Sequence, residues 1–182
     1  EVQYPTFPIR NKTSDIHVAT MSYGHGIAVS PLNIISALAT TVNGGEYIKP
    51  TVVIDPKLLS RPRIKVFDKD VSNIMKNLYK SNAEIGTAKK MKSMTYLVGA
   101  KTGTANKNDG RKYKKKKVVS SLITFFPINN PKYALFVLLD EPKATGSVLG
   151  RTPGFNAVPL SINIINEIAP ILGIKSTINA EL

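Results

Sequence analysis

The stretch of sequence that decides the fold reads Tyr96-Leu97-Val98-Gly99-Ala100-Lys101-Thr102-Gly103-Thr104-Ala105. Its first half is apolar, which is typical of a buried β-strand that runs into a polar end. Side chains alternate between the two faces of a strand, so Thr102 and Thr104 are predicted on one face and Lys101 and Gly103 on the other. The end of the strand therefore presents two hydroxyl groups together, with an ammonium group nearby.

Two more strands and a helix follow this stretch along the chain. Residues 118–126 and 133–140 are rich in Val, Ile, Leu and Phe, and the proline-bounded turn at 127–131 predicts an antiparallel hairpin. Residues 154–172 place apolar side chains at helical spacing and predict a helix packed on that sheet. The predicted fold class is α/β of the α+β kind, an antiparallel sheet with helices packed on it.

Two earlier segments are predicted to be helical. Ser30 is a good N-cap for a helix that ends at the Asn-Gly-Gly sequence of residues 43–45. A second helix begins at Asp68 or Asp70 and ends near Gly86. The apolar stripe of this second helix, which we expect to face a core, consists of Val71, Ile74, Met75 and Leu78.

Composition limits the classes of protein to which the chain can belong. Its 182 residues fit about one domain, and a hydrophobic content of 42% excludes wholesale disorder. The longest apolar runs are too short to cross a bilayer, and residues 1–20 read as an extended connection. The absence of cysteine excludes disulfides, thiolate catalysis and Cys-based metal sites. We find no metal-ligand spacing and expect neither a metal nor another cofactor.

Positive charge is concentrated in one segment. The net charge is +13, and residues 107–117 hold seven Lys and Arg residues against the single carboxylate of Asp109. Such a segment is compatible with a polyanion-binding or nucleic-acid-binding module. It is equally compatible with a solvated loop whose like charges repel, or with attraction to an anionic membrane surface or cell-wall polymer. The charge run alone does not choose among these alternatives, but we expect no nucleic-acid partner.

The polar end of the strand predicted at residues 96–105 is suited to binding an anionic ligand. Paired hydroxyl donors near an ammonium suit a carboxylate ligand, because charge-assisted hydrogen bonds are the strongest. We therefore expect Thr102 and Thr104 to bind the ligand and Lys101 to supply a positive field. Gly103 leaves room for close packing against neighbouring structure.

A Lys-Thr-Gly triplet is one of three signatures of the serine enzymes that react with penicillin. In this setting the chain resembles the C-terminal part of the transpeptidase domain of class B penicillin-binding proteins, and it is most similar to the division-specific type. The stretches that carry the resemblance occur in the family's order and are residues 21–32, 43–45, Pro50, 86–88, 98–105, 120–127 and Asn130-Pro131.

This resemblance implies a partial penicillin-binding-protein/β-lactamase-like fold and a peptidoglycan D,D-transpeptidase that is acylated by β-lactams. It implies catalytic roles for Lys101 and Thr104, with the Thr104 backbone N–H as an oxyanion-hole donor, and binding of substrate or β-lactam by Thr102, Gly103 and Thr104. The implied partners are stem peptides ending in D-Ala-D-Ala, β-lactams and other cell-division or cell-wall synthesis proteins. The implied location is the extracytoplasmic face of the bacterial cytoplasmic membrane, through an anchor outside this chain.

The nucleophile motif of the family is missing from the sequence. None of the 182 residues is a Ser followed three places later by Lys. The only Ser-x-Asn match, Ser161-Ile162-Asn163, follows the Lys-Thr-Gly strand and lies in a predicted helix. We therefore expect residues 1–182 to be the C-terminal portion of a transpeptidase domain, inactive alone, with the nucleophile-bearing half and the N-terminal anchor missing. A non-catalytic, penicillin-binding-like scaffold is the remaining alternative.

Other polar residues are weaker candidates for catalysis. A serine–histidine pair needs a histidine beside a serine and a third, orienting group, and neither His17 nor His25 has this setting in the sequence. Asp140 and Glu141 close a predicted strand just before Pro142, so we expect a solvated turn rather than a pair of acid–base carboxylates.

Overall fold

A three-stranded antiparallel sheet forms the centre of the computed structural model, which describes residues 14–108, 113–143 and 148–176. Its strands are β3 (Gly99–Asn108), β4 (Tyr113–Phe126) and β5 (Tyr133–Asp140), in the order β3-β4-β5. The predicted hairpin and the antiparallel sheet are confirmed. β3 starts later than its apolar lead-in suggested, and β4 starts before the predicted apolar run.

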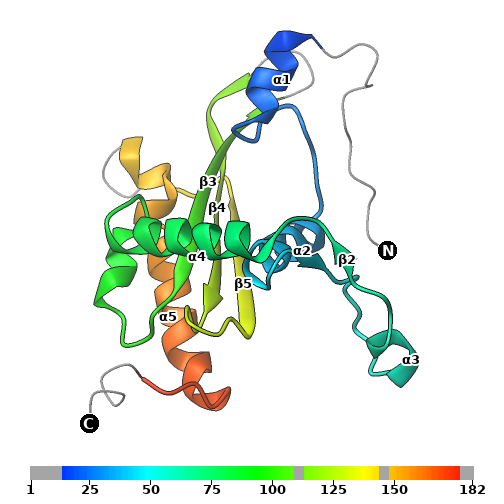
Figure 1. Cartoon of the computed structure of the whole chain (residues 1–182). Coiled ribbons are helices and arrows are strands. Elements are labelled where there is room, and N and C mark those ends of the chain that lie inside the picture. The colour runs from blue at the N-terminus through cyan, green and yellow to red at the C-terminus, as the bar shows by residue number, and fades with distance from the viewer. Residues whose placement is uncertain (1–13, 109–112, 144–147, 177–182) are drawn as a thin grey trace.

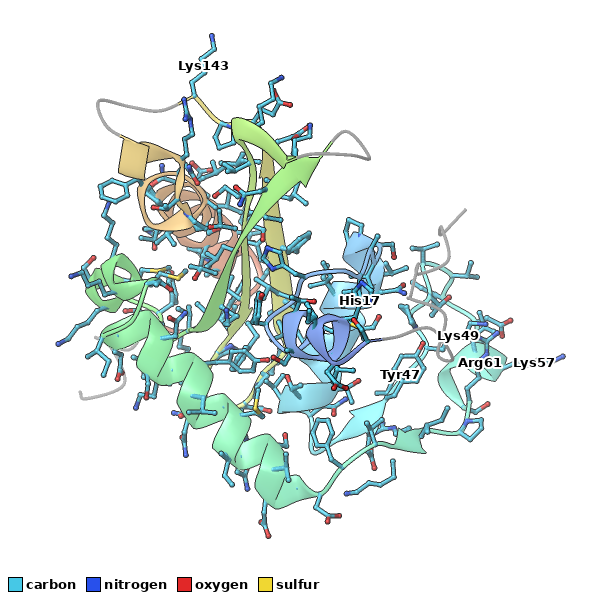
Figure 2. All side chains as sticks on the ribbon, turned by 90° about the horizontal axis from the view of Figure 1, so that it is seen from above. His17, Tyr47, Lys49, Lys57, Arg61 and Lys143 are labelled. Atoms are coloured by element: carbon cyan, nitrogen blue, oxygen red, sulfur yellow. The ribbon has the colours of Figure 1, made fainter. Side chains whose placement is uncertain are left out.

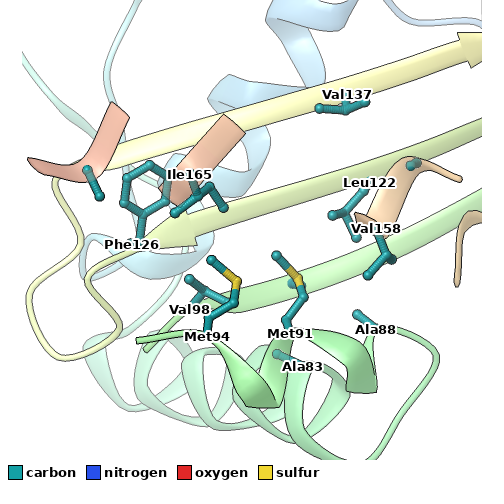
Figure 3. Close-up of a cluster of buried hydrophobic side chains, with 13 residues drawn as sticks. Ala83, Ala88, Met91, Met94, Val98, Leu122, Phe126, Val137, Val158 and Ile165 are labelled. Atoms are coloured by element: carbon teal, nitrogen blue, oxygen red, sulfur yellow. The ribbon is translucent and has the colours of Figure 1, made fainter. Parts of the chain in front are cut away.

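Helices cover both faces of this sheet (Figure 1). Helix α5 (Ala157–Ile171) packs on one face, where Val158 and Ile165 are fully buried. Figure 3 shows the cluster that these side chains form with Leu122 and Phe126 of β4. The predicted C-terminal helix and its packing on the sheet are thus confirmed.

Helix α2 (Pro31–Val42) packs on the opposite face, where Leu38 joins a second cluster with Ile123 and Phe125 of β4. The side chain of Ser30 caps α2 by accepting a hydrogen bond from the Asn33 N–H at 3.3 Å. The predicted start and end of this helix are confirmed.

Helix α4 (Lys69–Glu84) runs beside β3 and contributes to both clusters, with Tyr79 in one and Ala83 in the other. The predicted buried stripe is wrong for Val71, Ile74 and Leu78, which are 44%, 59% and 58% exposed, whereas its fourth member, Met75, is half-buried. The helix instead packs through Ser72, Tyr79 and Ala83. The buried Ser72 hydroxyl donates to the Thr41 carbonyl at 2.9 Å, a contact that only a short side chain allows.

The segment between α2 and α4 forms an arm that extends away from the sheet (Figure 1). It contains β1 (Glu46–Tyr47), α3 (Pro56–Leu59) and β2 (Ile64–Lys65), and β1 pairs antiparallel with β2. Figure 2 shows the basic side chains of Lys49, Lys57 and Arg61 on this arm. Three short 3₁₀ helices complete the description and are η2 (Lys89–Ser93), η3 (Val148–Arg151) and η4 (Pro153–Phe155).

The prediction of an extended connection at residues 1–20 is wrong for the part of that segment that the structure describes. Residues 1–13 lie outside the described residues, but Asp15–Met21 form helix α1. Ser14 precedes the first turn and Asp15 opens it, and both residue types favour a helix N-terminus. This local signal outweighs the absence of apolar periodicity.

Candidate active site

The Lys-Thr-Gly sequence lies on β3 at one edge of the central sheet. Within the described ranges β3 pairs only with β4, so its other edge carries backbone N–H and C=O groups that no described strand uses. An unpaired strand edge of this kind can bind an extended peptide through main-chain hydrogen bonds. The candidate site is therefore the region around this edge.

The two faces of β3 have different surroundings. Thr102 lies opposite Leu122, which belongs to the cluster under α5, whereas Lys101 lies opposite Ile123, which belongs to the cluster under α2. Thr104 shares the face of Thr102, two residues along. The predicted separation of the two hydroxyls from the ammonium is confirmed. That both hydroxyls meet one ligand stays a prediction.

Gly103 is required by the close approach of β4. A Cβ atom at this position would lie 2.7 Å from the Ser121 Oγ, too close for an ordinary contact. The Ser121 hydroxyl instead donates a hydrogen bond to the Gly103 carbonyl at 3.3 Å. Glycine here lets the two strands meet, as the sequence predicts.

Lys101 is exposed and borders an open groove of about 340 Å³. Its Nζ donates to the carbonyl of Thr102 at 2.8 Å, which places the ammonium close to the strand backbone. The groove is bounded mainly by apolar side chains of α2, the segment before it and α4, namely Ile27, Val29, Ile34, Ala37, Leu38 and Tyr79. The ammonium thus stands at the rim of an apolar depression.

Thr102 is tied to the end of α4. Its Oγ1 lies 2.6 Å from the Oγ1 of Thr87, and the Oγ1 of Thr87 donates to the Asn82 Oδ1 at 3.0 Å. Asn82 also donates from Nδ2 to the carbonyl of Ala100 at 2.9 Å. Asn82 was missed by the sequence reasoning. The only signal for it is its place in the last turn of a helix, just before the Gly86-Thr87 turn.

Thr104 is the exposed hydroxyl of the site. Its side chain makes no hydrogen bond to any residue that the structure describes. Opposite it on β4, the buried Ser120 hydroxyl is occupied because it donates to the Asn156 Oδ1 at 2.6 Å. The Thr104 hydroxyl is therefore available to a ligand.

The sequence also matches a known protein family, described as the penicillin binding protein transpeptidase domain, over residues 6–158. The chain belongs to this family. Curated relatives include a probable peptidoglycan D,D-transpeptidase FtsI from Caulobacter vibrioides, 34% identical over 168 residues that cover 87% of this chain and 28% of the relative. Another is the stage V sporulation protein D of Bacillus subtilis, 30% identical over 179 residues that cover 93% of this chain and 27% of the relative. The chain thus spans less than a third of the length of these relatives.

Solved structures agree on the fold. The transpeptidase domain of Burkholderia pseudomallei penicillin-binding protein 3 has a TM-score of 0.74 at 25% identity, over 93% of this chain and 51% of that one. Penicillin-binding protein 3 of Mycobacterium tuberculosis, solved in complex with ampicillin, has a TM-score of 0.77 at 20% identity, over 95% of this chain and 41% of that one. The partial penicillin-binding-protein fold predicted from the sequence is confirmed.

The remaining candidate residues lie apart from β3 or have structural partners. Ser161 is buried inside α5, where its hydroxyl donates to the Ala157 carbonyl at 2.8 Å, so it is not a Ser-x-Asn motif at the site. The Nδ1 of His17 lies 3.3 Å from the Ser14 Oγ at the start of α1, an exposed contact that no acidic side chain of the described residues orients. The Nδ1 of His25 is buried and has no hydrogen-bond partner among the residues that the structure describes, and its ring lies 5.2 Å from that of Tyr23.

The far end of the β3–β4 hairpin carries an ion-pair network. Lys107 Nζ lies 2.9 Å from a carboxylate oxygen of Asp140 and 3.0 Å from one of Glu141, and Lys117 Nζ lies 2.8 Å from the other oxygen of Glu141. Hydrogen bonds from Lys117, which has the larger effect, and from Lys107 lower the pKa of Glu141 to about 2. The hydrogen bond to Asp140, which has the larger effect, and the one to Glu141 raise the pKa of Lys107. Asp140 and Glu141 therefore neutralise both ends of the basic segment; the lysines between, residues 114–116, are not described at the level of side chains.

Two further properties concern the described residues alone. They contain no cluster of His, Asp and Glu side chains that could hold a metal ion. None of their helices is long and apolar enough to span a membrane.

Proposed function

We propose that this chain is the C-terminal portion of the transpeptidase domain of a serine-type peptidoglycan D,D-transpeptidase. The observation that carries the proposal is the placement of Lys101-Thr102-Gly103-Thr104 on an unpaired sheet edge, with a free hydroxyl on one face and an ammonium at the rim of a groove on the other. Membership of the transpeptidase family and relatives named D,D-transpeptidases support it.

The residues of the edge have distinct roles in this proposal. The backbone of β3 pairs with a stem peptide ending in D-Ala-D-Ala, and Thr104 donates to the terminal carboxylate. The Thr104 N–H stabilises the oxyanion that develops on the attacked carbonyl, and Lys101 supplies positive charge to the site. Thr102 and Gly103 complete the binding strand.

The nucleophilic serine comes from a segment outside these 182 residues, because they contain no Ser-x-x-Lys sequence. We propose that this segment packs in the groove beside Lys101. The groove is apolar, and the transpeptidase domain of Burkholderia pseudomallei is about twice as long as the part that this chain covers. An apolar groove next to a catalytic ammonium is suited to a helix that brings a serine to the strand edge.

The reaction then proceeds in two steps. The serine oxygen forms a bond to the penultimate D-Ala carbonyl carbon while the bond to the terminal D-Ala nitrogen breaks, and the proton lost by the serine hydroxyl ends on the leaving amine. The amine of a second stem peptide attacks the acyl-enzyme, forms the cross-link and releases the serine. A β-lactam acylates the same serine by ring opening and keeps its amine attached. The ampicillin complex of the Mycobacterium tuberculosis neighbour, which shares the fold, is consistent with this chemistry.

Fluorescent penicillin labelling tests this proposal. The 182-residue chain alone is expected to remain unlabelled, whereas the longer protein that adds the upstream segment is labelled covalently and loses the label when its motif serine becomes alanine. Labelling of the chain alone would refute the proposal that the nucleophilic serine lies outside these 182 residues. An unlabelled longer protein would refute the enzyme and favour the non-catalytic scaffold.

The proposal also includes an environment. We place the intact enzyme at the extracytoplasmic face of the bacterial cytoplasmic membrane, held by an anchor outside this chain and working with other cell-division or cell-wall synthesis proteins. Accessibility of a cysteine introduced at the exposed Val52 to a membrane-impermeant thiol reagent in whole cells tests this location.

A further inference from the structure

Helix α4 carries an exposed apolar seam on the side away from its buried residues Ser72 and Ala83. The seam consists of Val71, Ile74, Leu78 and Ile85, which are all exposed. These residues follow one another at intervals of three, four and seven positions, and the exposed Ser81 occupies the position that completes the series. This is the spacing of the a and d positions of a coiled coil over two heptads. The seam therefore has the form of one half of a coiled coil.

The borders of the seam hold little charge. The lysines of α4 are at positions 69, 76 and 80, outside the seam and its borders. The border positions are occupied by Asp70, Met75, Asn77, Asn82 and Glu84. An anionic membrane or polymer would favour lysine at such positions, whereas an apolar centre with few charges is typical of a contact between proteins. In a chain of net charge +13, a seam without lysine indicates a protein partner.

We propose that the seam pairs with the same seam of a second copy of the protein, in a parallel arrangement about a two-fold axis. Each seam residue then meets its own counterpart, so that Ile74 packs on Ile74 and Leu78 on Leu78 of the second copy. Ser81 forms the one polar layer. The seam does not include the strand edge of β3, so the dimer goes beyond the proposed transpeptidase function and does not depend on it.

The border residues favour the parallel over the antiparallel arrangement. An antiparallel pair brings equivalent borders together, so Asp70 would approach Glu84 of the second copy, and these like charges repel. A parallel pair brings opposite borders together, so Asp70 meets Met75 of the second copy. One heptad later, Asn77 meets Asn82. The parallel pair thus satisfies the self-complementarity that a two-fold contact requires.

The length of the seam determines how strong a dimer we expect. From Val71 to Ile85 the seam extends over 14 positions, which correspond to about 21 Å of helix. A contact of this length belongs to the small interfaces, below about 1,200 Å² in total, whose complexes are transient. We therefore expect a reversible dimer with a dissociation constant in the micromolar range.

Disulfide cross-linking of the intact protein tests the pairing. The 182 residues contain no cysteine, so Ile74→Cys adds a single thiol to them, in a background whose upstream cysteines are replaced by serine. Under mild oxidation Ile74→Cys is expected to form a covalent dimer at least about tenfold faster than Asn73→Cys, because linked Cα atoms must come within about 7 Å. Asn73 is the matched control, since it is exposed but lies about 100° around the helix from Ile74.

Two outcomes of the cross-linking would overturn the proposal. Equal rates for Ile74→Cys and Asn73→Cys would show that the seam does not pair. If Ile74→Cys and Leu78→Cys proteins link to each other faster than either links to itself, the pair is antiparallel and the parallel arrangement is wrong.

Sedimentation of the intact protein over a range of concentrations measures the dimer directly. Leu78→Asp brings two carboxylates together in the apolar seam and is expected to raise the dissociation constant at least about tenfold. Asn73→Asp adds the same charge outside the seam and should stay within about twofold. A wild-type protein that remains monomeric throughout the micromolar range, or equal effects of the two variants, would overturn the proposal.

The unfolding temperature distinguishes a second copy from the upstream half of the domain as the occupant of the seam. Because Leu78 is exposed in the described chain, Leu78→Asp should leave the unfolding temperature of the dilute, monomeric intact protein within about 2 °C of the wild type. A larger fall, without a matching fall for Asn73→Asp, would show that the upstream half buries the seam within one molecule, and the proposed dimer contact would be wrong.

Discussion

The two ends of β3 hold lysines in opposite ways. At the site end, Lys101 bonds only to the Thr102 carbonyl and makes no ion pair within the described part of the chain. At the far end, Lys107 pairs with the carboxylates of Asp140 and Glu141, and Lys117 pairs with that of Glu141. A lysine that must attract an anionic ligand has to keep its charge unneutralised, whereas a lysine that joins strands does not.

The strand is anchored differently at these ends as well. Neutral hydrogen bonds hold the site end, from Asn82 to Ala100 at 2.9 Å and from the buried Thr124 hydroxyl to the Gly99 carbonyl at 2.8 Å. Exposed ion pairs hold the far end, where solvent and salt weaken them. Neutral anchors thus hold β3 beside Lys101 without neutralising its charge, as the proposed role of Lys101 requires.

The largest expected effect is on Lys101. Lys101→Ala in the intact transpeptidase is expected to slow acylation by β-lactams at least about a hundredfold, because it removes the unpaired cation of the site. Lys107→Ala is the matched control, since its charge is already neutralised, and it should stay within about twofold. Stopped-flow or gel-based acylation rates measure both. Equal losses in the two variants would abolish the functional distinction between the ends of β3.

A smaller effect is expected from the neutral anchor. Asn82→Ala removes the donor to Ala100 and the acceptor of two Thr87 bonds, and it should lower the free energy of unfolding by about 2 kcal/mol. Ser81→Ala, one residue earlier and exposed, should change it by less than about 0.5 kcal/mol. Chemical denaturation measures the difference. Similar values for the two variants would show that Asn82 does not anchor the strand.

Close packing at Gly103 predicts a compensating pair. Gly103→Ala places a methyl group 2.7 Å from the Ser121 Oγ, so it should destabilise the protein by about 1 kcal/mol. Adding Ser121→Ala removes that oxygen and should restore about half of the loss, despite the missing bond to the Gly103 carbonyl. Unfolding of the two single variants and the double variant gives the coupling. If the changes in unfolding free energy of the two single variants add up to that of the double variant, the contact with the Ser121 Oγ is not what excludes a side chain at Gly103.

Local patterns were sufficient for β4, β5 and the helices α2 and α5. The apolar runs and the proline-bounded turn predicted β4 and β5, and the alternation along β3 placed Lys101 and Thr102 on opposite faces. These features depend on neighbours in sequence, which a pattern contains. The family motifs likewise led to the penicillin-binding-protein fold that the solved structures show.

Contacts between distant segments could not be predicted in the same way. Asn82 and Ala100 are separated by 18 positions, and Lys107 and Glu141 by 34, with no periodicity to connect them. The buried face of α4 was missed because the hydroxyl of Ser72 makes the contact, while the apolar stripe through Ile74 faces outward. Polar groups that bond across elements depend on the assembled fold rather than on local hydrophobicity.

The smallest expected effect is at the ion-paired end. The pKa of Glu141 is lowered from 4.5 to about 2, so its pairing stabilises the folded protein above pH 4.5, and this contribution is lost as the pH falls through about 2. The unfolding temperature should fall between pH 5 and pH 2, and Glu141→Gln should make that fall shallower.

Glu167→Gln is the matched control, because Glu167 is exposed on α5 and makes no ion pair with the described residues; it should leave the slope close to that of the wild type. A wild-type slope that Glu141→Gln does not change would mean that Glu141 pairs with neither Lys107 nor Lys117 in solution. The basic segment would then present its charge at both ends, and the polyanion-binding alternative would gain the cations that the ion pairs now remove from it. A steep dependence of oligonucleotide affinity on salt, lost when lysines 114–117 become serine, would complete that reversal. With the pairs intact we expect only weak oligonucleotide binding, because the carboxylates of Asp140 and Glu141 already neutralise Lys107 and Lys117.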